Sequence, residues 1–192
     1  MDVDAAPVPG LRYLPDYLDR DTQIRVLAEA DSQPWQHSGG RSVQIYGYSY
    51  HHVKGGIYRL GDLPAWALDV AARIHRDGLM PHLADQMIVN AYEAGAGISA
   101  HIDLSAFDDA IAAISLGSHC VMQFAEKASG REEELLIEPG SALVLSGEVR
   151  SRWTHAIPAR TSDLWHNREL VRRRRVSLTF RWMLHTSGTF TS

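Results

Sequence analysis

Three side chains in this 192-residue sequence have the types and spacing of a non-haem iron site. His101 and Asp103 are separated by one residue, and His155 follows Asp103 by 52 residues. Two imidazoles and one carboxylate form a facial triad, which leaves positions on Fe(II) open for substrate and dioxygen. The single Cys120 cannot build a thiolate site, and ligands this far apart are typical of a β-barrel or sandwich. We therefore predict that these three residues bind Fe(II), although Ni, Cu or Zn could occupy the site in vitro.

A second motif lies near the C-terminus, where residues 175–182 alternate strictly between polar and apolar types. Such alternation predicts a half-buried strand with Arg175, Ser177, Thr179 and Arg181 on one face. At about 3.3 Å per residue the arginine Cα atoms lie roughly 20 Å apart, so two inward-reaching side chains leave a gap suited to a five-carbon dicarboxylate. Arginine binds carboxylates bidentately and keeps its charge. The motif predicts a 2-oxoglutarate site, and an edge strand with a solvated charged face is the alternative.

Composition places the chain among single globular domains. It is 45% hydrophobic and 22% charged, and no apolar run approaches the length of a membrane span. The acidic start of the sequence lacks the features of a signal peptide, and one cysteine excludes an internal disulfide. We expect a cytoplasmic monomer that does not associate with membranes.

Charge is distributed unevenly along the sequence. Residues 1–147 carry 10 Lys/Arg against 20 Asp/Glu, whereas residues 148–192 carry 9 Arg against 3 acids. This asymmetry is a hint of a polyanionic partner, and Arg172, Arg173 and Arg174 could contact phosphates. In the alternative, these arginines pair with acids of the first part, such as residues 132–134.

Two helices are expected before residue 86. The first should follow Asp19 as N-cap and run to about Ala30, with Ile24, Leu27 and Ala28 facing inward.

The second helix should begin at Pro64 and end at Gly78, with Trp66, Val70 and Ile74 stacked on one face. Short strands separated by turn signals follow, and residues 157–174 are expected to form a surface loop. The fold class that we predict is α+β, mainly β: a double-stranded β-helix, or jelly roll, with N-terminal helices packed on one face. The expected strands cover residues 86–92, 111–117, 119–125, 134–137, 142–146, 151–156 and 175–184.

Several motifs, in order, resemble the AlkB family of Fe(II)/2-oxoglutarate dioxygenases from about residue 41 onward. The resemblance implies one dioxygenase domain over residues 1–192, with helical support and a nucleotide-recognition lid in 1–85 and a jelly-roll core in 86–184. The motifs are Asn90-Ala91-Tyr92, Gly95-Ala96-Gly97-Ile98, His101-Ile102-Asp103, Ser115-Leu116-Gly117-Ser118, Ser146-Gly147-Glu148-Val149-Arg150, Trp153-Thr154-His155 and the strand 175–181.

The resemblance also implies residue roles. Arg181 would hold the 1-carboxylate of 2-oxoglutarate and Arg175 the 5-carboxylate, with Asn90 and Tyr92 as hydrogen-bonding neighbours. Dioxygen would complete the reaction, in which decarboxylation drives oxidation of a substrate C–H bond. On an N-alkyl base the hydroxylated product would collapse and release an aldehyde.

Residues 41–50 resemble the nucleotide-recognition lid of that family, whose aromatic residues could sandwich an extruded base. In the alternative, these residues form a tyrosine-rich hairpin whose rings simply pack. Trp35 and His52 could join the aromatic residues of the lid in lining the base-binding site. The candidate substrate-binding residues are Arg41, Tyr46, Tyr48, Tyr50, Ser105 and Arg150.

Two departures separate the chain from the well-known bacterial repair enzymes. Ser177 stands where those enzymes carry Asn, and Ser105 stands in place of an acidic residue. Both features resemble the branch that is joined to a tRNA methyltransferase in animals. The preferred hypothesis is oxidative demethylation or hydroxylation of nucleic-acid bases, DNA or RNA. The same chemistry on a protein side chain or small molecule, and a non-catalytic metal-containing binding module, are the alternatives.

Overall fold

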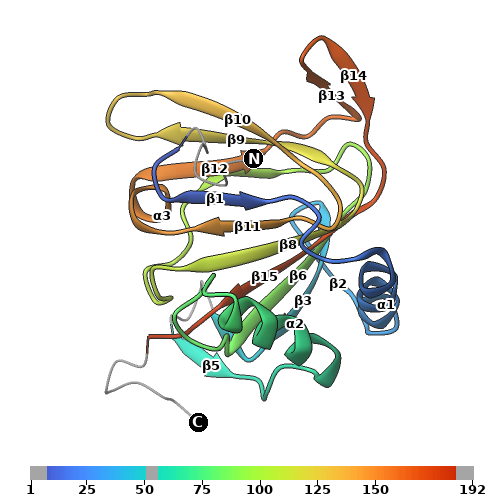
Figure 1. Cartoon of the computed structure of the whole chain (residues 1–192), viewed down its shortest axis with the longest axis vertical. Helices are drawn as coiled ribbons and strands as arrows, with labels where there is room; N and C mark the ends of the chain where they lie inside the picture. Colours follow the sequence, from blue (N-terminus) through green and yellow to red (C-terminus); the bar gives the residue numbers. More distant parts are fainter. Residues whose placement is uncertain (1–7, 51–55, 185–192) are drawn as a thin grey trace.

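Two facing β-sheets form the centre of the protein (Figure 1). The computed structural model describes residues 8–50 and 56–184. The larger sheet has the strand order β1-β11-β8-β15-β6-β3-β2, the smaller one β10-β9-β12-β7, and all neighbours are antiparallel. The predicted jelly-roll fold is therefore confirmed. The larger sheet contains β1 Leu11–Leu14, β2 Gln36–Ser38, β3 Arg41–Tyr46, β6 Gln86–Tyr92, β8 Ile111–Gly117, β11 Ala142–Leu145 and β15 Arg175–Arg181; the smaller contains β7 Ile98–His101, β9 Cys120–Glu126, β10 Glu132–Ile137 and β12 Trp153–Ile157.

Strand β15 lies in the middle of the larger sheet, between β6 and β8. Its apolar residues Val176, Leu178 and Phe180 are buried against the helices, and its polar residues face the smaller sheet. The alternation read from the sequence therefore assigns the two faces correctly. The alternative of a solvated edge strand is wrong, because both arginines of β15 are buried.

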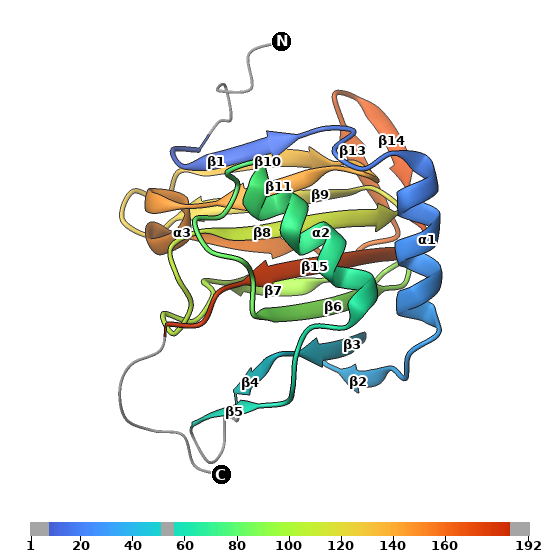
Figure 2. The same ribbon diagram turned by 60° about the horizontal axis from the view of Figure 1, so that its bottom comes forward.

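Two helices cover the outer face of the larger sheet, where α2 crosses β8 and β15 (Figure 2). Helix α1, Arg20–Asp31, begins after Asp19, whose carboxylate accepts a hydrogen bond from the Thr22 amide as an N-cap. Ile24 is 58% exposed and Ala28 is also exposed, so their predicted inward orientation is wrong. The buried positions of α1 are Val26 and Ala30, and Leu27 packs partly buried against the same core, as predicted.

Helix α2, Ala65–Arg76, begins after Pro64 as predicted and buries Val70 and Ile74, with Trp66 packed at the edge of the same core. Gly78 has a positive φ of 67° just beyond the last turn, a conformation that glycine adopts readily. Within the described ranges, no helix is long and apolar enough to cross a membrane.

One short helix and two pairs of strands complete the described chain, and two predicted strand boundaries are corrected. The predicted strand 151–156 is shifted, because the short helix α3, Gly147–Arg152, precedes β12. Likewise, β15 ends at Arg181 rather than at residue 184. The residues before 86 do not form a separate layer, since β1, β2 and β3 join the larger sheet. The remaining strands are β4 Tyr48–Tyr50 with β5 Ile57–Arg59, and β13 Ser162–Trp165 with β14 Arg168–Val171.

The predicted surface loop 157–174 instead contains the hairpin β13–β14, which projects from the sheets (Figure 1). Its anchor is Asp163, whose side chain is fully buried and accepts bonds from Arg172 Nε and Nη2 at 2.6 Å each. The Val121 amide donates to the same carboxylate at 3.0 Å, and Arg160 donates at 2.7 Å. A bidentate, buried carboxylate of this kind fixes the hairpin to β9.

Asp163→Asn should lower the free energy of unfolding by about 3–5 kcal/mol, because the buried charge of Arg172 loses its partner. Urea denaturation at pH 7 measures this loss. The matched control is Asp62→Asn, which removes an exposed ion pair with Arg59 and should cost less than about 1 kcal/mol.

The ion pair between Asp163 and Arg172 also predicts how the stability of the protein depends on pH in acid. Burial acts to raise the pKa of Asp163, but hydrogen bonds from Arg172, the Val121 amide and Arg160 outweigh it and lower the pKa. The stabilisation is thus complete above about pH 3.9, the unfolded value, and is lost as the pH falls through the folded pKa. An equal cost of Asp163→Asn and Asp62→Asn at pH 7 would contradict this account.

Candidate metal centre and cosubstrate pocket

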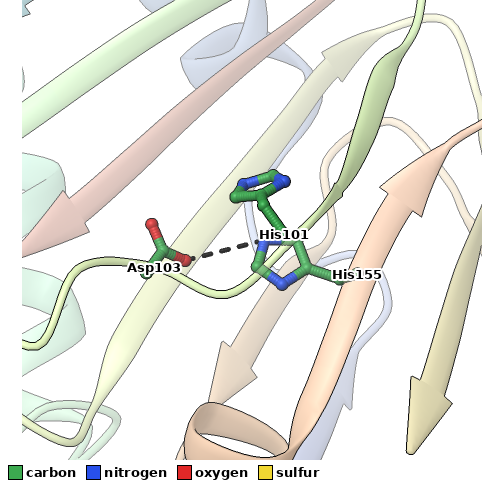
Figure 3. Close-up of side chains that lie close together, drawn as sticks. All are labelled: His101, Asp103 and His155. Atoms are coloured by element: carbon green, nitrogen blue, oxygen red, sulfur yellow. Dashed lines mark ion pairs between the residues drawn. The ribbon is translucent and has the colours of Figure 1, made fainter. Parts of the chain in front are cut away.

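His101, Asp103 and His155 converge between the two sheets (Figure 3). His101 ends β7 and is paired in register with His155 of β12, while Asp103 follows in the loop after β7. One ligand atom from each residue lies within 4.8 Å of the others, and the two imidazole rings are 4.3 Å apart. The distant sequence positions are brought together by one antiparallel strand pair. The donor set and its convergence fit a single metal ion such as Fe(II).

The carboxylate of Asp103 is held ionised beside this centre. Burial alone would raise its pKa, but the positive charge of Arg181 and the nearby imidazole of His155 lower the pKa to about 2. Arg181 donates to Asp103 Oδ1 from Nε at 3.1 Å and from Nη2 at 2.5 Å. The ligand is therefore available in its charged form without loss of a proton.

His155 is poised as a neutral ligand, and a backbone contact orients the ring of His101. His155 is nearly buried, and burial lowers its pKa to about 4 although the charge of Asp103 acts in the opposite direction. His101 Nδ1 lies 2.8 Å from the carbonyl oxygen of Ser99. A proton on Nδ1 would be donated to that oxygen, which leaves Nε2 free to bind a metal.

Arg150, a predicted substrate-binding residue, contacts the loop that carries Asp103. It is 7% exposed, and it donates to the Asp103 carbonyl at 3.0 Å and to the Leu104 carbonyl at 2.6 Å. A longer bond of 3.4 Å reaches the carbonyl of Phe107. Arg150 is thus committed to the backbone of the loop that carries Asp103, and it links that loop to the helix preceding β12.

The predicted cosubstrate residues lie on two adjacent strands, β15 and β6, and a third strand, β8, contributes Ser115 beside them. Arg175 is paired with Tyr92 of β6, and Ser177 with Asn90 of β6 and Ser115 of β8. Thr179 and Arg181 follow on the same inner face. The structure therefore brings all six predicted residues, including Asn90 and Tyr92, to the wall that faces the metal centre.

Arg175 has the properties expected of an anion-binding residue. It is 4% exposed, its Nε donates to Ser115 Oγ at 2.9 Å, and its guanidinium lies 5.7 Å from the centre of the Tyr92 ring. Within residues 8–50 and 56–184, no carboxylate forms an ion pair with it. A buried cation without a counter-charge is costly unless an anion binds. The pocket wall therefore fits a carboxylate ligand at this end.

The candidate substrate residues are spread over different surroundings. Arg41 donates to Asn90 Oδ1 at 2.9 Å and so reaches the cosubstrate wall. Tyr46 packs edge-on against Trp66 on the helix side of the sheet, and Tyr48 is buried in a small cluster. For these two tyrosines, ring packing accounts for their placement. Ser105 is exposed in the loop after Asp103.

Three further positions, Tyr50, His52 and Trp35, were predicted to lie in or beside the aromatic lid. The side chain of Tyr50 and the whole of His52 lie outside the described residues. Trp35 packs on the helix-side core with the guanidinium of Arg174 5.6 Å from its ring centre, so it does not form a wall with the lid.

Sequence reasoning missed Gln86 and Ser115. Gln86 accepts a hydrogen bond from Arg181 Nη1 at 3.2 Å, and Ser115 accepts one from Arg175. The register of β6 and β8 against β15 would have identified both, since each lies beside its arginine in the sheet or diagonal to it.

Residues 40–181 match the 2OG-Fe(II) oxygenase superfamily. The alkylated DNA repair protein ALKBH8 homolog of Arabidopsis thaliana is 35% identical over 204 residues, which cover 91% of this chain and 58% of the relative. The tRNA (carboxymethyluridine(34)-5-O)-methyltransferase ALKBH8 of Macaca fascicularis is 34% identical over 167 residues, covering 81% of this chain and 25% of the relative. This chain therefore spans little more than half of the first relative and a quarter of the second.

The solved structure of OsALKBH1 superposes on this chain with a TM-score of 0.70 at 14% identity. The superposition covers 91% of this chain and 97% of that one. The fold is therefore shared along nearly the whole length of both.

The low pKa of His155 predicts how the metal-free protein responds to acid. Between about pH 6.5, the unfolded value, and pH 4, the unfolded chain binds a proton that the folded chain does not. Stability should therefore fall as the pH drops through this window, by up to about 3 kcal/mol. Urea unfolding in EDTA at pH 7 and pH 4.5 measures the fall. His155→Asn should reduce it, whereas the same change at exposed His37 should not.

Arg150→Met should weaken Mn(II) binding by about 10- to 100-fold, because the loop carrying Asp103 loses its three carbonyl contacts. Calorimetric titration measures the affinity, and circular dichroism checks that the variant is folded. Arg152→Met is the matched control, since Arg152 lies on the exposed side of the same helix beside Glu148. Unchanged Mn(II) affinity in a folded Arg150→Met protein would contradict the positioning role.

Proposed function

This chain belongs to the 2OG-Fe(II) oxygenase superfamily and is homologous to AlkB family members including ALKBH8, and we propose that it oxidises alkylated or modified bases of nucleic acid. The resemblance drawn from its motifs is thereby confirmed. One observation carries the cosubstrate assignment: the buried guanidinium of Arg175 has no acidic partner among the described residues and belongs to the same inner face of β15 as Arg181, which contacts Asp103 of the metal triad.

Each residue of the site has its own role in the proposed reaction. His101, Asp103 and His155 would hold Fe(II), which with 2-oxoglutarate and dioxygen supplies the oxidation of a C–H bond. Arg175 would bind the distal carboxylate of 2-oxoglutarate, and Arg181 would bind the proximal carboxylate while it fixes Asp103. Burial of this wall between the sheets excludes water from the cosubstrate.

Support for a nucleic-acid substrate comes from the relatives. The names of the Arabidopsis and macaque proteins refer to alkylated DNA repair and to a tRNA methyltransferase. A zebrafish relative, 27% identical, is described as a probable RNA/DNA demethylase. Arg41 lies where the lid meets the pocket, and exposed Ser105 is available near the metal loop. DNA and RNA both remain candidates within the proposal.

The second candidate is the same chemistry on a protein side chain or small molecule. It is favoured by the reduced positive charge of the arginine-rich segment. Arg172 is paired with Asp163, and Arg174 with Asp31 at 2.6 Å and Glu93 at 3.4 Å. Arg173 is the exposed member of the run, so the polyanion surface is weaker than the sequence suggested. The cytoplasmic location and the monomeric state stay predictions.

Aerobic succinate release from the Fe(II)-loaded protein tests the proposal. We expect succinate to increase when methylated single-stranded DNA or methylated tRNA is added, and formaldehyde to appear with it. His101→Ala should abolish both products and retain the melting transition, because a partly exposed ligand is not core packing. Arg173→Met is the matched control and should retain basal succinate release.

The other outcomes separate the alternatives. Succinate release unaffected by any nucleic acid would contradict the proposed substrate class and favour a protein or metabolite. An absence of succinate under all conditions, with metal bound, would leave the non-catalytic binding module.

A further inference from the structure

The hairpin β4–β5 is fastened at its base to the start of β6. A Cβ atom on Gly47, whose φ is 78°, would lie 1.8 Å from the carbonyl oxygen of Asp85, so the two backbones touch. Leu60 donates to the Gly47 carbonyl at 2.7 Å and closes the base of the hairpin from the other side. Only glycine fits this approach. The position of Tyr48, the next residue, is thus tied to Gln86.

Gln86 connects this base directly to Arg181. The Gln86 side chain is 1% exposed, its Nε2 donates to the Tyr48 carbonyl at 3.4 Å, and its Oε1 accepts from Arg181 Nη1 at 3.2 Å. The two residues are also register partners in the sheet. The buried side-chain amide of Gln86 therefore hydrogen-bonds to the hairpin through Nε2 and to Arg181 through Oε1.

A second connection runs through Phe107, which is 9% exposed. Its ring packs in a cluster with Tyr48 and Met183, and the guanidinium of Arg181 lies 5.1 Å from the ring centre. The Phe107 carbonyl also accepts a bond from Arg150. The ring is thus held between the hairpin on one side and Arg181 on the other.

These contacts surround the Arg181 guanidinium. Asp103 accepts from Nε and Nη2, Gln86 accepts from Nη1, and the Phe107 ring lies against the group. Two of the three contacts come from residues that also contact Tyr48. A displacement of the hairpin base must therefore disturb the hold on Arg181.

We propose that Gln86 and Phe107 are positioning residues that couple the β4–β5 hairpin to the binding of 2-oxoglutarate by Arg181. Binding of 2-oxoglutarate fixes Arg181 and thereby stabilises the hairpin base. By linkage, a ligand that stabilises the base of the hairpin tightens the hold on 2-oxoglutarate by the same factor. The proposal rests on the proposed function in its assignment of Arg181 to the cosubstrate.

Hydrogen exchange of the Mn(II)-loaded protein, with and without 2-oxoglutarate, tests the coupling without any nucleic acid. In the wild type, saturating 2-oxoglutarate should slow exchange of the β15 amides and of the β4 and β5 amides. In Gln86→Met and in Phe107→Leu, β15 should still be protected at saturation, while protection of β4 and β5 is reduced. Protection of β4 and β5 should vanish in the variant that carries both Gln86→Met and Phe107→Leu.

Calorimetric titration of the same proteins gives a second readout. Each variant should bind 2-oxoglutarate about fivefold more weakly, in the range of one lost hydrogen bond or cation–π contact. Ile74→Ala is the control: a truncation at a side chain of α2 that is 0% exposed and belongs to a different cluster on the helix side of the sheet. It should lower the melting temperature and leave both the affinity and the β4–β5 protection unchanged.

Three results would overturn the coupling. Protection of β15 without protection of β4 and β5 in the wild type would remove the coupling and leave the cosubstrate site intact. Equal losses in Ile74→Ala would show a general effect of core destabilisation. Failure of 2-oxoglutarate to protect any strand would overturn the cosubstrate assignment as well, which identifies it as a failure of the proposed function.

Discussion

The buried ion pair between Asp103 and Arg181 is the interaction on which the site depends. Asp103 belongs to the loop after β7 of the smaller sheet, and Arg181 ends β15 of the larger sheet, so the pair joins the two halves of the sandwich at the metal centre. Each side chain is 9% exposed. Either charge alone would be strongly disfavoured there, and removing one partner would leave the other uncompensated. The pair therefore fixes the charged state of the ligand and the position of the cosubstrate arginine together.

Sequence periodicity predicted which face of a regular strand or helix is buried. The alternation in β15 identified the inner polar face, and the spacing of α2 identified Val70 and Ile74 as buried, because each pattern repeats the geometry of its own element. In α1 it was right for Leu27 and wrong for Ile24 and Ala28, which are exposed. That helix has a weakly segregated sequence, so the stripe it buries is selected by the sheet beneath it.

The chemistry was predicted in part, for a related reason. Residue types revealed the metal triad, since few structural needs place two histidines and an aspartate in that pattern. They could not show that Arg150 would bind backbone carbonyls or that Tyr48 would be buried. Both roles depend on loops that meet only in three dimensions. The arginine run 172–174 suggested a stronger positive surface than the structure has, because Asp163 pairs with Arg172 and Asp31 pairs with Arg174. Neither pairing could be predicted from neighbouring residues in the sequence.

The charges inside the sandwich do not balance without ligands. Arg150, Arg175 and Arg181 are all buried, while Asp103 is the acidic residue among them at the metal centre. A divalent metal would add to this positive excess, and a dicarboxylate would remove about half of the total. Coulomb interactions weaken little across a dry interior. Metal and 2-oxoglutarate should therefore stabilise each other's binding beyond any direct bond, and the excess of fixed arginines explains why a dianion, rather than a neutral ketone, is the ligand that this wall selects.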